Sequence, residues 1–249
     1  MEFTNRLEVP TAMHWHGIRN LNEMDGVPNL TQAAIALCDS FDLQTIRLAT
    51  AQRADIMVEM PAGELGLEEV STGESVGAAM LKANGLVPAM ANSPAVMAWY
   101  DRPDLSGARV IDVYLEGGAI GNLLSTQFEG DVLALRDLAQ AHSKLWAFNG
   151  IVGGYYHLLA YLVLGEVSVL RIWNDTRSEH SMHLHGHHFW ADSREFGDKV
   201  RSVLRDTYLM TAGERADLVF VANNPKMWLF HCHMMEHHAS GMGAVISVT

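Results

Sequence analysis

Short stretches rich in apolar residues, separated by turn-forming residues, run through most of the chain. From Glu166 to Arg171 polar and apolar positions partly alternate, as in a strand with one buried face. Glycine, asparagine and proline separate the stretches, for example at Gly117-Gly118 and at Asn223-Asn224-Pro225. On this basis the sequence predicts strands at residues 44–48, 55–60, 110–116, 166–173, 216–222, 227–231 and 243–248.

The spacing of these strands predicts an all-β protein built as a sandwich or a barrel. The chain shows no internal repeat of the kind found in solenoids and propellers. Residues 106–249 are long enough for one complete sandwich, which needs about 100 residues, whereas residues 1–36 are too short to close one. We therefore expect a partial first segment (1–36), a partial middle segment with a proline-containing linker (37–105) and a complete C-terminal domain (106–249).

Composition narrows the class of protein. Hydrophobic residues make up 49% of the 249 residues, which is enough to fill a core and argues against a disordered chain. The net charge of −12 argues against binding to a nucleic-acid backbone, which needs clustered Lys and Arg. No apolar run is long enough to span a membrane, and the first residues lack the pattern of a secretory signal. Two cysteines make a disulfide framework improbable, and we interpret Cys38 as a small buried hydrophobic residue.

The 13 histidines are concentrated in a few places, and residues 37–105 contain none. Three segments hold most of them: His14-Trp15-His16-Gly17, residues 180–187 and residues 231–242. Because residues two apart in a strand share a face, each His-x-His sequence presents two imidazoles on one side. In the third segment, Cys232 should face away from His231 and His233, so that one strand could serve two metal centres.

The cysteine segment has the composition of a known type of metal site. A thiolate joined by two imidazoles and a weak axial thioether is the ligand set of a blue copper centre. His237 and Met242 follow Cys232 within ten residues, which suits a loop that folds back around one ion. His180 is the natural candidate for the second imidazole, and we interpret Met242 as the axial ligand.

Six imidazoles from the three His-x-His pairs could surround a cluster of copper ions. Other interpretations stay open at this point. His14 and His16 could be half-buried strand residues, and the run 180–188 could be a pH-sensitive patch or a zinc site. Met234 and Met235 are better explained as core filling than as metal ligands.

Taken together, these motifs resemble the multicopper oxidase family, which comprises laccases, bilirubin oxidases and bacterial copper-resistance oxidases, and the bacterial type is the nearest match. Residues 24–28 (Met-Asp-Gly-Val-Pro), 146–150 (Trp-Ala-Phe-Asn-Gly) and 212–217 also resemble sequences of this family. The resemblance implies cupredoxin-like Greek-key β-sandwich domains, with the C-terminal domain covered almost throughout.

The resemblance also implies a ligand set. The type 1 copper would be bound by His180, Cys232 and His237, with Met242 as axial ligand. The other implied ligands are His14 and His183 for the type 2 copper, His16 and His233 for one type 3 copper, and His185 and His231 for the other. Asp25 resembles an acidic residue that the family places near the cluster for proton delivery, although an Asp-Gly pair is also a common turn.

A family member of this kind would bind up to four copper ions and take single electrons from phenols, aromatic amines or metal ions. Electrons would pass from the type 1 copper to a three-copper cluster that reduces O2 to water. The implied partners are therefore a small-molecule electron donor and O2, without nucleic acid or a membrane span. A periplasmic or secreted location also follows from the resemblance, and a homo-oligomer stays open.

The chain departs from the family in one respect. A second His-x-His pair expected after the first motif is absent, so that two of the ten ligand histidines are missing and the chain looks internally shortened. His142 and His157 are not spaced as a pair that could replace them, and His238 stands where relatives often carry a carboxylate. An alternative function is therefore a copper-binding or electron-transfer module, or an inactive remnant, that has a type 1 site but an incomplete cluster.

Overall fold

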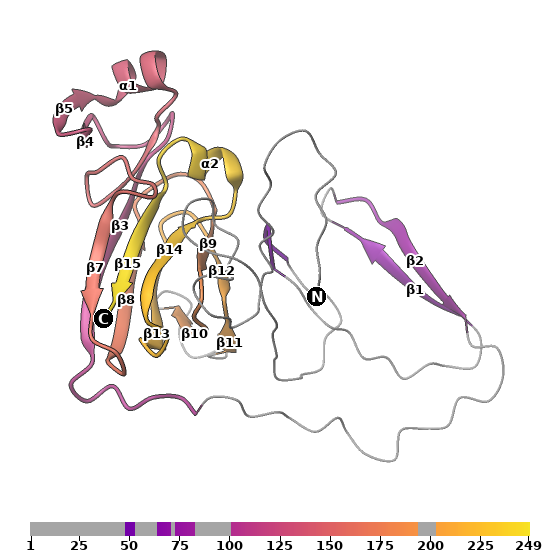
Figure 1. Ribbon diagram of the computed structural model, residues 1–249. Helices are drawn as coiled ribbons and strands as arrows, with labels where there is room; N and C mark the ends of the chain where they lie inside the picture. Colours follow the sequence, from indigo (N-terminus) through magenta and orange to yellow (C-terminus); the bar gives the residue numbers. More distant parts are fainter. Residues whose placement is uncertain (1–47, 53–63, 71–72, 83–100, 194–202) are drawn as a thin grey trace, which may run out of the picture. The chain divides into compact units, whose positions relative to one another are not determined.

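The computed structural model describes residues 48–52, 64–70, 73–82, 101–193 and 203–249 (Figure 1). His14, His16, Asp25 and Cys38 lie outside these residues, as does the predicted strand at 55–60. Leu48 is the one described residue of the predicted strand at 44–48, and it has no regular structure. The proposed domain boundaries at 36 and 105 stay predictions.

The larger sheet contains six strands in the order β11-β10-β13-β8-β3-β6. Their bounds are β3 Arg109–Gly117, β6 Trp146–Phe148, β8 Val167–Asn174, β10 Phe189–Ser193, β11 Val203–Arg205 and β13 Arg215–Val221. Strands β3 and β8 run parallel, while β13 pairs antiparallel with both β8 and β10. The alternating pattern in β13, with Ala216, Leu218 and Phe220 buried, is that of a strand with one face on the core.

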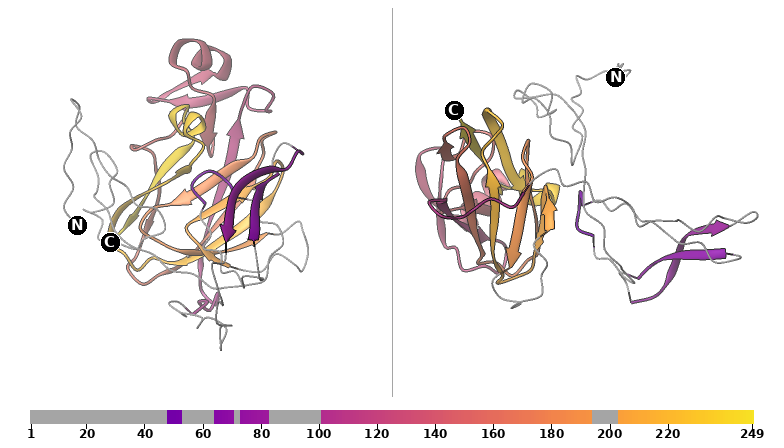
Figure 2. Two further views of the ribbon diagram at one scale, coloured as in Figure 1. Left: turned by 90° about the vertical axis from the view of Figure 1, so that its right-hand side faces the viewer. Right: turned by 90° about the horizontal axis from the view of Figure 1, so that it is seen from below.

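The second sheet contains five strands in the order β12-β9-β14-β15-β7. Their bounds are β7 Leu158–Leu162, β9 His180–Leu184, β12 Thr207–Met210, β14 Lys226–Cys232 and β15 Gly243–Val248. β9 is buried along its whole length, because side chains on its two faces are both covered. One hydrophobic core joins the sheets, and it contains Leu170 and Ile172 of β8, Met182 of β9 and Phe230 of β14. The expected two-sheet β-sandwich is therefore confirmed, and Figure 2 shows it from two further sides.

Two short additions project from one end of the sandwich (Figure 1). One consists of the hairpin β4 (Ser125–Phe128) and β5 (Asp131–Ala134) followed by helix α1 (Leu135–His142). The other is helix α2 (Met235–Ala239), which lies between β14 and β15. A separate unit at residues 53–96 contains the antiparallel hairpin of β1 (Glu64–Glu69) and β2 (Val76–Lys82). Within the described ranges, no helix is long and apolar enough to cross a membrane.

The five predicted strands after residue 105 are all confirmed, with ends that differ by at most one residue. The other strands and both helices were not predicted, namely β1, β2, β4, β5, β6, β7, β10, β11, β12, α1 and α2. A strand at β9 was expected only from its His-x-His spacing, because its buried polar histidines leave no apolar alternation.

Candidate metal centre

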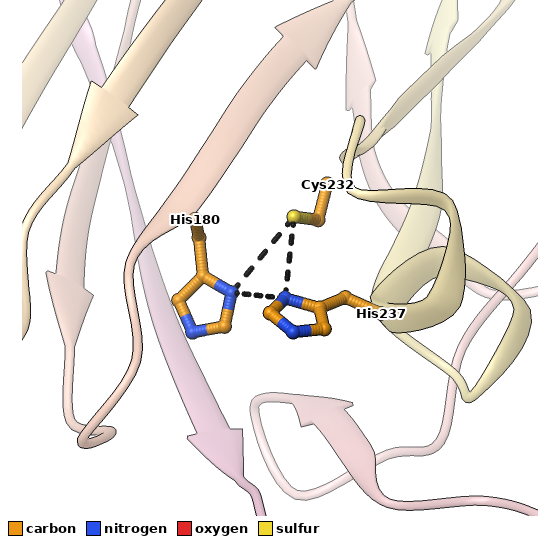
Figure 3. A group of neighbouring side chains, drawn as sticks. All are labelled: His180, Cys232 and His237. Atoms are coloured by element: carbon orange, nitrogen blue, oxygen red, sulfur yellow. Dashed lines mark hydrogen bonds between the residues drawn. The ribbon is translucent and has the colours of Figure 1, made fainter. Parts of the chain in front are cut away.

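His180, Cys232 and His237 point toward one another from three separate elements (Figure 3). His180 is the first residue of β9, Cys232 is the last residue of β14, and His237 lies in α2. The Cys232 Sγ lies 3.8 Å from His180 Nδ1 and 3.7 Å from His237 Nδ1, and the two Nδ1 atoms are 3.0 Å apart. Cys232 and His180 are completely buried, whereas His237 is half-buried, so that the edge of the group nearest to solvent is the imidazole of His237.

The backbone between Cys232 and Met242 closes on itself around this group. The Cys232 N–H donates to the Met242 carbonyl oxygen at 3.1 Å, and the Met242 N–H donates to the His237 carbonyl oxygen at 3.0 Å. Met242 is fully buried in the same core as Cys232. The loop thus returns Met242 beside the cysteine, as the spacing in the sequence predicts.

A buried hydrogen-bond chain orients His180. The Thr176 hydroxyl donates to Asn174 Oδ1 at 2.6 Å, so its oxygen can accept from His180 Nε2–H at 2.8 Å. This arrangement leaves the lone pair on Nδ1, the nitrogen that faces the sulfur. The indole ring of Trp146 packs against both imidazoles. Its centroid lies 5.0 Å from that of the His180 ring and 4.5 Å from that of the His237 ring.

The environment favours the uncharged forms of these groups. Burial raises the pKa of the Cys232 thiol to about 11, while backbone hydrogen bonds with Met234 and Ser181 oppose the rise. Burial, and then the neighbouring His237, lower the pKa of His180 to about 3, and burial lowers the pKa of His237. A metal ion that binds here must displace the thiol proton but finds two neutral imidazoles.

A second group lies on the other face of the same strands. The ligand atoms of His183, His185 and His231 all lie within 4.8 Å of one another, and all three residues are buried. His183 of β9 stands directly opposite His231 of β14 in the strand register, and the Nε2 atoms of His185 and His231 are 3.1 Å apart. The alternation of Cys232 and His231 thus assigns neighbouring residues to two different groups, as predicted from the strand geometry.

Hydrogen bonds also orient the second group. His183 Nδ1–H donates to the Asp206 carbonyl oxygen at 2.9 Å and lies 3.0 Å from the Thr207 hydroxyl. His231 Nδ1–H donates to the Cys232 carbonyl oxygen at 2.9 Å. Because a carbonyl can only accept, both Nδ1 atoms carry the proton, and both Nε2 atoms carry the lone pair that a metal needs.

Two further imidazoles border the second group. The ring of His233 lies 5.2 Å from that of His231 and 5.8 Å from that of His183. The ring of His238 lies 4.6 Å from that of His231, and Tyr155 lies on its other side at 5.6 Å. Gly243 makes room for His238, because a Cβ at this position would stand 2.9 Å from its Nδ1.

Residues 48–52 contact the strands that carry both groups. The Ser181 hydroxyl donates to the Thr50 carbonyl oxygen at 2.7 Å, and the Gln52 side chain donates to the Thr207 carbonyl oxygen at 2.9 Å. The Ser181 carbonyl in turn accepts from His233 N–H at 2.6 Å. Residues 48–52 are thus tied to β9 and β12 beside the histidines.

The structure therefore brings together seven of the ten residues predicted as ligands in two compact groups, with His233 beside the second. Those in the groups are His180, Cys232, His237 and Met242 in the first, and His183, His185 and His231 in the second. The predicted ligands His14 and His16, and the predicted proton donor Asp25, are outside the described residues. Sequence reasoning missed Thr176 and Asp206, since neither carries a recognisable motif.

The buried imidazoles predict that the metal-free protein loses stability in mild acid. Burial and the neighbouring histidines His185, His238 and His233 hold the pKa of His231 well below its usual value, and that of His180 is about 3. The unfolded chain, with histidine pKa values of about 6.5, binds more protons below that pH, so each such residue lowers the free energy of unfolding by up to about 1.4 kcal/mol per pH unit. Urea unfolding of the metal-free protein at pH 7, 6 and 5 should show a steady fall.

Between pH 6.5 and pH 5 the pH lies above the ordinary pKa values of carboxyl groups. The change in stability over this interval is therefore expected to come mainly from histidines. Glu116 contributes to the pH dependence of stability in the opposite direction. Burial raises its pKa, so its protonation in acid favours the folded state. A His180→Asn variant should have a shallower dependence of stability on pH than the unmodified chain. Equal stability at pH 7 and pH 5 would contradict the neutral, buried state of these residues.

Two sequence models of one family match this chain. Both are described as multicopper oxidase, one matching residues 1–50 and the other residues 132–249. Together they account for most of the chain. The match to residues 132–249 includes every residue of both groups described above.

Individual relatives agree with this match. The multicopper oxidase MmcO of Mycobacterium tuberculosis is 28% identical over 202 residues, which covers 81% of this chain and 38% of that protein. Laccase-7 of Oryza sativa subsp. japonica is 38% identical over 79 residues, which covers 28% of this chain and 14% of that protein. The chain therefore spans well under half the length of these curated relatives.

Solved structures show the same fold. The McoA multicopper oxidase of Aquifex aeolicus superimposes with a TM-score of 0.58 at 16% identity, covering 76% of this chain and 41% of that one. The multi-copper oxidase of Pseudomonas thermotolerans gives 0.54 at 24% identity, covering 77% of this chain and 41% of that one. These neighbours are built from cupredoxin-like sandwiches, which agrees with the architecture described above. On the two matching sequence models and these relatives, the chain belongs to the multicopper oxidase family.

Proposed function

We propose that this chain is a copper-dependent oxidoreductase of the laccase-like type, which takes single electrons from a small reducing donor. The observation that carries the proposal is the group of Cys232, His180 and His237, closed by a loop that returns Met242 to the core beside the cysteine. Family members bind copper, and this donor set is the one that blue copper sites use. Copper in such a site supplies one-electron redox chemistry, and the residues supply its shape and surroundings.

The residues of the first group have separate tasks in this proposal. Cys232 supplies the thiolate, and His180 is held for binding by Thr176. His237 is half-buried, so that its outer edge is where an electron donor can come closest to the group. Trp146 packs against both imidazoles and is proposed to limit the access of water to them. We infer phenols, aromatic amines or low-valent metal ions as donors, because a partly exposed imidazole edge accepts electrons without enclosing the donor.

The second group is proposed to hold the copper at which O2 is reduced to water. The peptide bond between His231 and Cys232 joins the two groups covalently, and His233, which borders the second group, follows Cys232 directly. His14 and His16 are proposed as further ligands, and Asp25 as a proton donor. We infer a periplasmic or secreted location from the family resemblance.

A second function is favoured by the missing His-x-His pair. With two ligand histidines absent from the sequence, the chain could carry electrons through the first group without reducing O2. This alternative class is a copper-binding or electron-transfer module. A second copy of the chain would not supply the absent pair, because it has the same sequence.

One experiment separates these functions. The purified chain is loaded with Cu²⁺, its copper is counted, its visible absorption is recorded, and O2 uptake is followed with a one-electron donor. An oxidase should be blue and consume O2. Blue colour without O2 uptake would select the electron-transfer module, and the absence of any blue band after copper loading would overturn the type 1 assignment.

A further inference from the structure

A row of three rings leads from the surface of the sandwich to the second group. Tyr155 is 36% exposed, and its ring centroid lies 5.6 Å from that of His238, which is half-buried. The His238 ring in turn lies 4.6 Å from the ring of His231, which is buried. Rings at these separations are in contact. One intervening imidazole therefore separates a solvent-exposed phenol from a proposed copper ligand.

Glycines in the loop before β7 bring Tyr155 into this row. The Gly153 N–H donates to the Gly241 carbonyl oxygen at 2.9 Å, and the Gly154 N–H donates to the Gly243 carbonyl oxygen at 2.7 Å. A Cβ on Gly153 would lie 1.8 Å from the Gly243 carbonyl oxygen, so that only glycine allows this close approach. The loop thus lies directly against the start of β15, where Gly243 also leaves room for His238.

Exposure alone does not single out Tyr155. Tyr156, the next residue, is 97% exposed, but its ring contacts no other ring in the described part of the chain. Tyr208 is buried, and its hydroxyl donates to Glu214 at 2.6 Å. At the first group Trp146 contacts both imidazoles but is itself buried. Within the described ranges, Tyr155 is thus the tyrosine that joins solvent to a histidine beside a metal group.

The chemistry of the row suits the movement of single electrons. A phenol is one of the side chains that lose an electron most easily, and it gives up its hydroxyl proton when it does so. Tyr155 is exposed enough for water to take that proton. The imidazole of His238 is harder to oxidise than a phenol, so that it connects Tyr155 to His231 without holding the radical itself.

We propose that Tyr155 is a second electron entrance, which supplies the second group without passing through the cysteine site. The O–H bond of Tyr155 breaks: its electron passes by way of His238 to the copper at His231 while O2 is reduced there, and its proton goes to water. The neutral tyrosyl radical that remains returns to tyrosine when a phenolic donor in solution gives it one electron and one proton. This role rests on the proposed function, because O2 at the second group is the oxidant.

The test uses the full chain with Cys232→Ser, so that electrons from the first group do not compete. The variant is loaded with copper, its copper is counted, and it is reduced with ascorbate under argon, freed of excess reductant, mixed with O2 or with H2O2 and frozen. We expect the narrow EPR signal of an organic radical, which ring-deuterated tyrosine should narrow further. Adding Tyr155→Phe keeps a ring against His238 but removes the phenol, so the signal should be lost while the copper content is unchanged.

The neighbouring tyrosine offers a matched control, since Tyr156→Phe makes the same chemical change and should leave the signal in place. His238→Ala interrupts the row and should lower the radical yield. A spin trap followed by peptide mapping should place the adduct at Tyr155, whereas oxidants released into solution would favour the more exposed Tyr156.

Two results would overturn the inference alone: a copper-loaded second group that yields no tyrosyl radical with either oxidant, or a radical that survives both Tyr155→Phe and His238→Ala. A spin-trap adduct found at Tyr156 and not at Tyr155 would also overturn it. A second group that binds no copper would refute this role together with the proposed function. O2 uptake by the unmodified chain reports on the proposed function separately.

Discussion

Replacing Cys232 with serine is expected to abolish the blue absorption of the copper-loaded chain and to remove about one bound copper ion. The band of such a site arises from charge transfer between thiolate sulfur and copper, and a serine hydroxyl at the same position cannot supply it. Cys232 is the one cysteine in the described part of the chain, and its sulfur is the donor that both His180 and His237 face. Visible absorption and copper content after loading are the measurements.

The sequence offers a matched control, because it contains one other cysteine, Cys38. Cys38→Ser makes the same chemical change at a position interpreted as a small hydrophobic residue, and it should leave the blue band in place. If both variants kept the band, sulfur from Cys232 would not be a ligand. If Cys38→Ser removed the band and Cys232→Ser did not, the assignment of the thiolate would be reversed.

The grouping of these side chains was predictable from the sequence, because in a strand the spacing between two residues decides whether they lie on the same face. Side chains in residues 231–233 alternate between the two faces of the strand, so Cys232 lies on the opposite face from His231 and His233. In the structure Cys232 faces His180, while His231 stands opposite His183. The return of Met242 followed from its distance along the chain, although helix α2 within that loop did not. Five residues carry too little periodicity to predict a helix.

The surroundings of the ligands could not be predicted, since they depend on contacts between strands that are far apart in sequence. Asp206 reaches His183 because β12 pairs with β9, and nothing in the sequence near Asp206 indicates that pairing. Thr176 lies only four residues before His180, yet a threonine at that distance is ordinary in any loop. Helix α1 was also missed, although Leu135 and Leu138 are both buried at helical spacing, because eight residues between strands resemble a continued β pattern.

These missed contacts explain why two groups of neutral imidazoles can be buried in one sandwich. Three of these imidazoles, those of His180, His183 and His231, have one nitrogen occupied by a protein acceptor, which removes most of the cost of burying that atom. The other nitrogen is directed to a shared point, where a metal ion is its natural partner. Backbone carbonyls and a short polar side chain thus fix the directions of these imidazoles, while the His-x-His motifs supply the imidazoles themselves.

Replacing Gly186 with alanine is expected to destabilise the protein by about 2–5 kcal/mol, as the cost of a left-handed backbone adds to that of an overpacked core. Gly186 has a φ of +67°, and a Cβ there would lie 2.2 Å from two ring carbons of Trp228. Trp228 cannot move aside easily: it is fully buried, its indole N–H donates to the Asn224 carbonyl at 2.8 Å, and Asn224 donates to the Gly186 carbonyl at 2.9 Å. Urea unfolding of the metal-free protein measures the loss.

Gly165→Ala is the matched control, because Gly165 has a φ of +89° but no atom within 4 Å of an added Cβ. It should lose only the cost of the backbone conformation, about 1–2 kcal/mol, so that the difference between the two variants reports the contact with Trp228. Gly186 directly follows His185, and a shift of this turn should also weaken copper binding by the second group, which Gly165→Ala should not do. Equal losses of stability in the two variants would show that the core around Trp228 can adjust, and that the position of His185 does not depend on close packing at this glycine.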